Sequence, residues 1–141
     1  MLKRFLILLF FISLGCTSDK VSEADLHYLN GYWEIKEVKF PDGNIKNYSI
    51  NKTIDYIKMD SLKGYRKKVN PTLDGSFRTN NDAELFTISI AKETVLLSYK
   101  NSMTEWTEEL INVSQAHFST RNSDGVTYTY QRFEPINIEK E

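Results

Sequence analysis

The sequence predicts an all-β protein, an up-and-down antiparallel barrel of eight strands preceded by a short N-terminal helical turn. After residue 29 the chain is a series of short segments rich in β-branched and aromatic residues, separated by turn signals and without helical periodicity. Eight sequential strands joined by short turns close most simply into a barrel, because closure removes the exposed strand edges of an open meander.

The chain begins with the build of a secretory signal. Lys3 and Arg4 precede an unbroken apolar run over residues 5–12, and the small residues Ser13 and Gly15 follow. The apolar run is far shorter than the roughly 20 residues that a membrane-spanning helix needs. We therefore predict that residues 1–15 are a cleaved signal peptide.

Cys16, the single cysteine of the chain, comes directly after this segment. Leu14, Gly15 and Cys16 resemble the lipobox of bacterial lipoproteins, although Ser13 stands where that motif prefers Leu. The resemblance implies lipidation at Cys16 and a lipid-anchored place in the bacterial envelope, on the outer membrane, at its periplasmic face or the cell surface. The alternative is an ordinary signal followed by a free thiol, which would be exposed to oxidation in an exported protein.

The lipidated cysteine and a polar tether are expected to occupy residues 16–27, before a barrel over residues 28–135 and a tail over 136–141. At the junction, Ser22 is expected to cap a helical turn over "EADLHYL". Leu26 and Leu29 would then face the domain.

The first strand is predicted over residues 31–40. Trp33 and Ile35 share one face, whereas Val38 and Phe40 have the opposite parity. Because side chains alternate strictly along an unbroken strand, this change predicts a bulge near residues 36 and 37. "PDGN" then forms a turn.

Seven further strands are predicted from the same features, segments rich in β-branched and aromatic residues between turn signals. "NSDG" (122–125) predicts a tight hairpin between the last two, and "NPTLDG" (70–75) marks a longer loop or an edge. The seven predicted strands cover residues 53–59, 63–69, 84–90, 94–100, 105–113, 116–121 and 125–133.

The first and last strands of the predicted barrel resemble those of lipocalins. Gly31 and Trp33 form a Gly-x-Trp motif on the first strand, and "DGVTYTYQRFE" resembles the last strand of the small lipocalin-like domains of bacterial lipoproteins. The resemblance implies that Arg132 packs across Trp33 and closes the base of the barrel. A desolvated cation–π contact of this kind contributes on the order of 2 kcal/mol, so we treat these three residues as structural.

The sequence offers little for catalysis. The chain has a net charge of −1, which gives no support to nucleic-acid binding, and it carries none of the strong catalytic, metal or phosphate-loop motifs. Its two histidines are His27 and His117, and we expect His117 to face solvent beside Phe118. We predict no enzyme, no metal and no cofactor.

Two charged segments leave alternatives open. In "EWTEE", Glu108 shares its parity with Trp106 and Leu110, so it is either one polar exception on a solvated strand or an inward group in a cavity. "KGYRKKV" (63–69) is a basic patch for anionic headgroups or an acidic partner, or, as we favour, a charged edge that discourages aggregation.

An eight-stranded barrel is either filled by its own side chains or holds one small ligand. The leading hypothesis is a lipid-anchored binding protein that holds a small apolar or amphipathic molecule in its barrel. The alternative is a structural or interaction module with a filled barrel that binds another envelope protein, and an enzyme ranks third. The candidate ligand-lining residues are Tyr56, Phe86, Ile88, Leu97, Tyr99, Phe118, Tyr128 and Tyr130.

Overall fold

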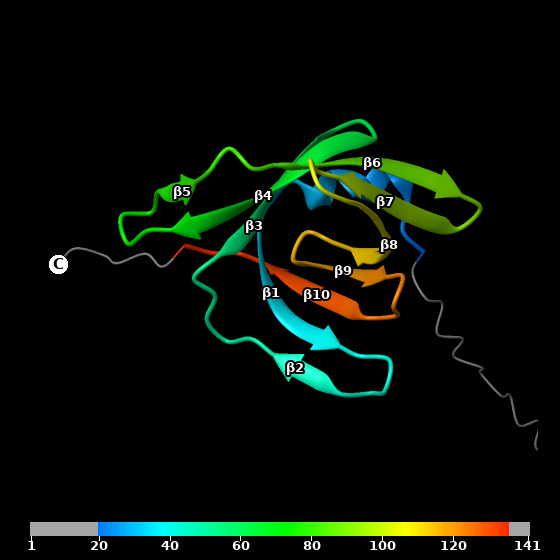
Figure 1. The fold of residues 1–141 in the computed structure, drawn as a ribbon, viewed down its shortest axis with the longest axis horizontal. Helices are drawn as coiled ribbons and strands as arrows, with labels where there is room; N and C mark the ends of the chain where they lie inside the picture. Colours follow the sequence, from blue (N-terminus) through cyan, green and yellow to red (C-terminus); the bar gives the residue numbers. More distant parts are fainter. Residues whose placement is uncertain (1–19, 136–141) are drawn as a thin grey trace, which may run out of the picture.

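A computed structural model describes residues 20–135, which form one short 3-10 helix and ten antiparallel strands (Figure 1). The helix, η1, spans Glu23–Leu29. The strands are β1 (Gly31–Lys39), β2 (Ile45–Asn47), β3 (Ile54–Asp60), β4 (Lys63–Pro71), β5 (Phe77–Thr79), β6 (Glu84–Ala91), β7 (Thr94–Lys100), β8 (Glu105–Val113), β9 (His117–Asn122) and β10 (Thr127–Arg132).

Eight of these strands close into a barrel. Each strand of the order β1-β3-β4-β6-β7-β8-β9-β10 pairs with its neighbours, and β10 returns to β1 with Trp33 opposite Arg132. The predicted barrel of eight strands is therefore confirmed. β2 and β5 lie outside the ring, where they extend β1 and β4 as short hairpins.

The predicted bulge in the first strand is present. The register of β1 against β10 shifts between Ile35 and Glu37, so Ile35 lies opposite Tyr130 and Val38 opposite Tyr128. The extra residue turns Val38 back toward the interior, where it is buried. The strand therefore contributes apolar side chains to the interior on both sides of the bulge.

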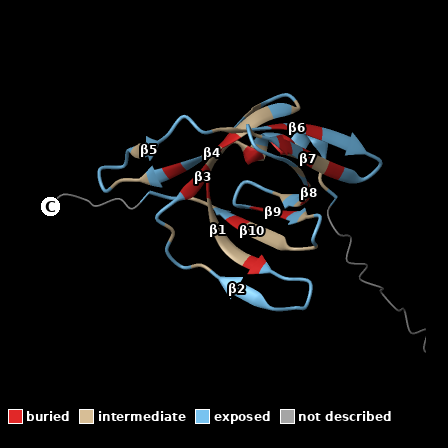
Figure 2. Ribbon diagram, viewed as in Figure 1, coloured by how far each residue is buried: buried red, intermediate tan, exposed pale blue. Residues whose placement is uncertain are grey.

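The eight ring strands lie close to the predicted ranges, whereas β2 and β5 were not predicted. All three residues of β2 are exposed, as Figure 2 shows, so the segment carries no alternation of apolar and polar residues. The predicted "NSDG" hairpin is confirmed: Gly125 has a positive φ of 78° and donates its N–H to the Asn122 carbonyl.

Helix η1 covers one end of the barrel, which we call the closed end. Leu26 and Leu29 are buried beneath it, as predicted. The Ser22 side chain makes no capping hydrogen bond, which corrects our expectation; its carbonyl instead accepts the N–H of Asp25. The turn at residues 61–62 lies against this helix.

Arg132 locks the helix to the barrel at the closed end. Its guanidinium carbon lies 3.8 Å from the centroid of the Trp33 ring, the contact that the resemblance implies. Its Nη1 donates to the carbonyl of Asn30 at 2.6 Å and its Nη2 to that of Tyr28 at 2.8 Å. The Trp33 Nε1 donates to the Leu29 carbonyl at 2.8 Å. One arginine thus joins the first strand, the last strand and the helix.

Apolar side chains fill the barrel from the closed end upward. Trp33 and Phe118 meet edge-to-face at 4.8 Å, and Phe118 stacks on Tyr130 at 4.4 Å. This part of the barrel is packed with apolar side chains, which leaves the opposite, open end as the more accessible side for a ligand. The buried core consists of Leu26, Leu29, Trp33, Ile57, Phe86, Ile88, Val95, Leu97, Tyr99, Leu110, Phe118 and Tyr130.

Candidate functional site

The interior changes from apolar to polar toward the open end. Strand alternation places Arg66 of β4 on the inner face opposite Ile57, and Glu108 of β8 opposite Asn122 of β9. They border a hollow of about 280 Å³. Its lining residues are Arg66, Trp106, Glu108, Asn122, Tyr128 and Tyr130.

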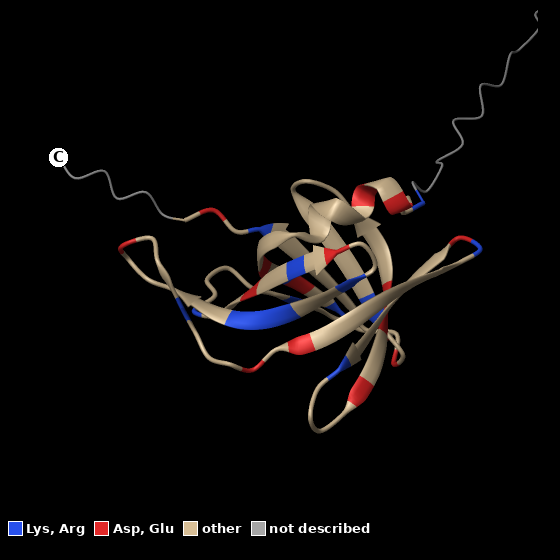
Figure 3. Cartoon of the chain, turned by 90° about the horizontal axis from the view of Figure 1, so that it is seen from above, with Lys and Arg blue, Asp and Glu red and all other residues tan. Residues whose placement is uncertain are grey.

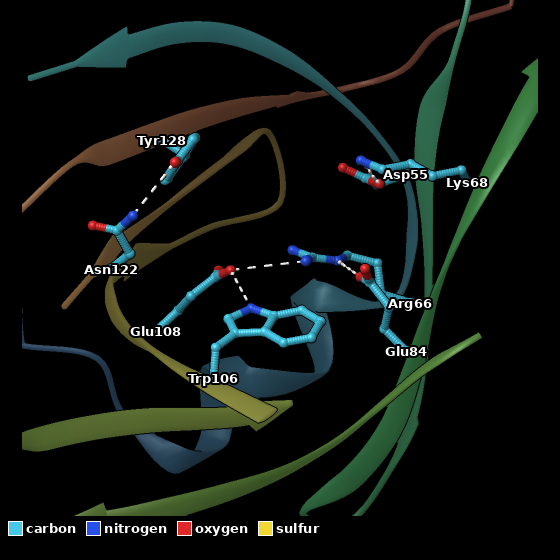
Figure 4. Close-up of polar contacts among 8 residues, drawn as sticks. All are labelled: Asp55, Arg66, Lys68, Glu84, Trp106, Glu108, Asn122 and Tyr128. Carbon is cyan, nitrogen blue, oxygen red and sulfur yellow. Dashed lines mark hydrogen bonds and ion pairs between the residues drawn. The ribbon is translucent and has the colours of Figure 1, made fainter. Parts of the chain in front are cut away.

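Arg66 is the central cation of this region (Figure 4). Its Nε donates to Glu84 Oε2 at 2.7 Å, and its Nη2 lies 3.7 Å from Glu108 Oε1. The guanidinium also lies over the Tyr99 ring, 4.4 Å from the centroid. Since Arg66 is only 9% exposed, these contacts replace water around its charge.

Glu108 is buried on the same inner face, with 7% of its surface exposed. Trp106 Nε1 donates to its Oε1 at 3.1 Å. Within residues 20–135, its Oε2 is buried and accepts no hydrogen bond. The inward orientation settles the alternative that the sequence left open.

Two further polar pairs lie nearby, and Figure 4 shows them beside the Arg66 cluster. Lys68 Nζ contacts Asp55 Oδ1 at 2.5 Å, which compensates a carboxylate that is 3% exposed. Asn122 Nδ2 lies 3.4 Å from the Tyr128 hydroxyl and donates to it weakly.

Burial and neighbouring charges determine the protonation of Arg66, Tyr99 and Tyr130 in the interior. Desolvation opposes the charged form of Arg66, but Tyr99, Tyr130 and the carboxylates of Glu108 and Asp55 outweigh it and raise its pKa above the ordinary value. Burial raises the pKa of the Tyr99 and Tyr130 phenols. At neutral pH, Arg66 is therefore charged and both phenols are neutral.

The candidate ligand-lining residues separate into three groups. Tyr128 and Tyr130 line the hollow. Tyr56 lies on the outer face, where it packs against Tyr32 at 4.7 Å and Tyr65 at 6.2 Å, because the neighbouring Asp55 takes the inward position. The others, Phe86, Ile88, Leu97, Tyr99 and Phe118, belong to the buried core below the hollow.

The predicted basic patch does not form one surface. Arg66 and Lys68 point into the barrel, whereas Lys67 lies on the outer face, 5.7 Å from the Tyr65 ring. Figure 3 shows basic and acidic segments interspersed over the strands. The inward orientation of Arg66 was not predicted, although the sequence places Arg66 and Lys68 two residues apart and therefore on the same face of a strand.

The remaining sequence-based candidates contribute no second site. His117 is exposed, as expected, and His27 is exposed on η1. In residues 20–135, no cluster of three histidine, cysteine or acidic side chains could hold a metal ion. No helix in that range is long and apolar enough to cross a bilayer. Cys16 lies outside the described residues.

A larger groove of about 710 Å³ crosses the outer face of β4, β6, β7 and β8. Outward side chains such as Thr87, Ser98 and Thr107 line it, together with Leu85. None of its lining groups is a buried polar atom lacking a partner. The smaller hollow is therefore the better candidate for a specific site.

The closed ring of eight antiparallel strands, the helix across one end and the Arg132–Trp33 contact define a lipocalin-like barrel. No family model and no curated protein matches the chain. A solved structure of a lipocalin-like protein from Bacteroides uniformis is similar over 75% of this chain and 99% of its own, with a TM-score of 0.47 and 11% identity. The assignment of the class rests on the strand order and closure of this chain itself.

Proposed function

We propose that this protein binds the polar end of a small amphipathic molecule at the open end of its barrel. The hollow beside Arg66 and Glu108 carries the proposal, because it combines aromatic walls with convergent charged groups above a solid core. At about 280 Å³ it offers room for roughly nine water-sized groups. The ligand, or the part of it that enters, is accordingly small.

We also propose that Cys16 carries a lipid that anchors the protein to the bacterial outer membrane. The support is the sequence around Cys16, which resembles a lipobox. Mass spectrometry of the N-terminal peptide from membranes tests this proposal. An acylated peptide beginning at Cys16 is expected, and an unmodified thiol would contradict it.

Native mass spectrometry of the full chain, purified in a mild detergent, tests the ligand-binding function. We expect a bound small molecule whose occupancy falls when Tyr128→Trp narrows the hollow and persists in Tyr56→Trp, a control on the outer face. A clean mass for the wild-type chain, unchanged after incubation with extracts of envelope small molecules, would contradict the proposal.

A docking function is the second candidate, and one observation favours it. Ile50, Leu73 and Met103 lie on three different loops and are 88%, 84% and 92% exposed. Exposed apolar side chains on loops can supply contacts to another envelope protein, although these three are not contiguous in the chain. Stoichiometric crosslinking from Leu73, with no ligand in the hollow, would favour this function over the first.

A further inference from the structure

The polar cluster at the open end has one carboxylate more than it has cations. Asp55 pairs with Lys68, and Glu84 accepts a short hydrogen bond from Arg66 Nε. The cation nearest to Glu108 is Arg66, whose Nη2 lies 3.7 Å away, too far for a hydrogen bond. The same guanidinium is already paired with Glu84. Because the buried phenols are neutral, the cluster carries an excess of one negative charge.

The Oε2 atom of Glu108 is where this excess charge lacks a partner. Its side chain is more than nine-tenths buried and lines the hollow. Among the described residues, none donates a hydrogen bond to this oxygen. A buried acceptor without a donor is unfavourable, and more so when it is charged, because it has lost its hydrogen bonds to water without replacing them. A ligand that donates a hydrogen bond and carries a positive charge would remove this cost.

Besides Arg66, whose charge is counted above, the walls of the hollow carry aromatic rings that suit a cation. Trp106, Tyr128 and Tyr130 supply aromatic rings beside Glu108, and aromatic faces attract ammonium groups. The same cluster already holds one cation in this way, since Arg66 lies over Tyr99. The ring of Trp106 is in turn stacked on Tyr99 at 5.1 Å, so its position is fixed before a ligand arrives.

We propose that the hollow binds a singly charged primary ammonium group, which donates to Glu108 Oε2 and lies among the rings of Trp106, Tyr128 and Tyr130. This inference rests on the proposed ligand-binding function and specifies the charge of the ligand. An amphipathic amine has the required parts: the ammonium group enters the hollow and the apolar body extends toward the open end.

Three probes that share one phenylethyl body and differ in the charge of the head group test the charge requirement: 2-phenylethylamine, the neutral 2-phenylethanol and the anionic 3-phenylpropanoate. The full chain is titrated with each while the indole N–H resonance of Trp106 is followed by NMR, because this group donates to Glu108. A charge-assisted hydrogen bond adds about 1.5 to 3 kcal/mol, so the amine is expected to bind at least about tenfold more tightly than the alcohol. The carboxylate is expected to bind more weakly than both.

Glu108→Gln supplies the matched variant, because it keeps the shape and removes the charge. It should abolish the preference for the amine over the alcohol, whereas Glu109→Gln, on the adjacent outward position, should retain it. The urea midpoint of each variant establishes that the barrel is folded. The wild-type comparison of the three probes decides the question even if Glu108→Gln fails to fold.

The outcomes separate the two proposals. Equal affinity for amine and alcohol, or a preference for the carboxylate, would overturn the ammonium site and leave the ligand-binding function standing. No shift of the Trp106 resonance with any probe would count against the hollow as a binding site, and therefore against both.

Discussion

Arg132 provides the sharpest test of how the closed end is held together. Replacing it with Met keeps much of the apolar stem but removes the charge over Trp33, the donors to the carbonyls of Asn30 and Tyr28, and an exposed hydrogen bond to the carbonyl of Gln115. The cation–π contact contributes about 1 to 2 kcal/mol. The two partly buried hydrogen bonds add about 1 kcal/mol each after allowance for solvent screening. We therefore expect Arg132→Met to lower the free energy of unfolding by about 3 to 4 kcal/mol.

Urea unfolding of the full chain, followed by tryptophan fluorescence, measures this loss. Arg132→Lys keeps a charge over the ring but not the fork of donors, so about half of the loss is expected. Arg121→Met is the control, because Arg121 is exposed and its one side-chain hydrogen bond within residues 20–135 is a 3.4 Å contact with Thr127. This variant should change the free energy of unfolding by less than about 0.5 kcal/mol. A loss below about 1 kcal/mol for Arg132→Met, or an equal loss for both methionine variants, would refute the reasoning.

Three further predictions concern a glycine, the core and an exposed loop. Gly31→Ala, where φ is +123° and a Cβ would collide with the Arg132 guanidinium, should cost at least about 2 kcal/mol more than Gly43→Ala, where φ is +90° and the space is open; similar urea midpoints would contradict this. Leu97→Ala should cost about 2 to 5 kcal/mol, whereas Leu85→Ala, 61% exposed, should cost less than about 0.5 kcal/mol; reversed losses would mean that the predicted strand register is wrong. Hydrogen bonds from Ser76 and Thr72 lower the pKa of Asp74 to about 2, so its contribution to stability is present above its unfolded pKa of about 3.9 and lost as the pH falls toward 2. Carboxyl NMR should show this titration, and an Asp74 signal that titrates near 3.9 would contradict it.

The sequence was sufficient for the parts of the fold that depend on local pattern. Alternation of side chains located the ring strands, and the change of parity after Ile35 located the bulge. The Arg132–Trp33 contact followed from the resemblance of the first and last strands to those of lipocalins. Strands β2 and β5 were not predicted, because a strand of three residues is too short to show a periodic pattern.

The site was harder to predict, because aromatic residues occur on both faces of this barrel. Tyr56 belongs to an outer cluster with Tyr32 and Tyr65, and the inner position beside it is taken by Asp55. Sequence reasoning treats charged residues as solvent-facing, and Arg66 and Glu108 are exceptions because they compensate one another in part across the barrel. Which charges pair across the interior depends on the closed geometry and not on local pattern.

The closed end is also the end where the described chain enters the domain: Lys20 pairs with Glu93, in the turn between β6 and β7, and η1 follows at once. The hollow lies at the other end of the strands. If Cys16 is lipidated as proposed, a tether this short holds the closed end toward its own membrane and directs the hollow away from it. The ligand would then enter the hollow from the aqueous side or from a partner protein at the open end. It would not come directly from the bilayer that holds the anchor.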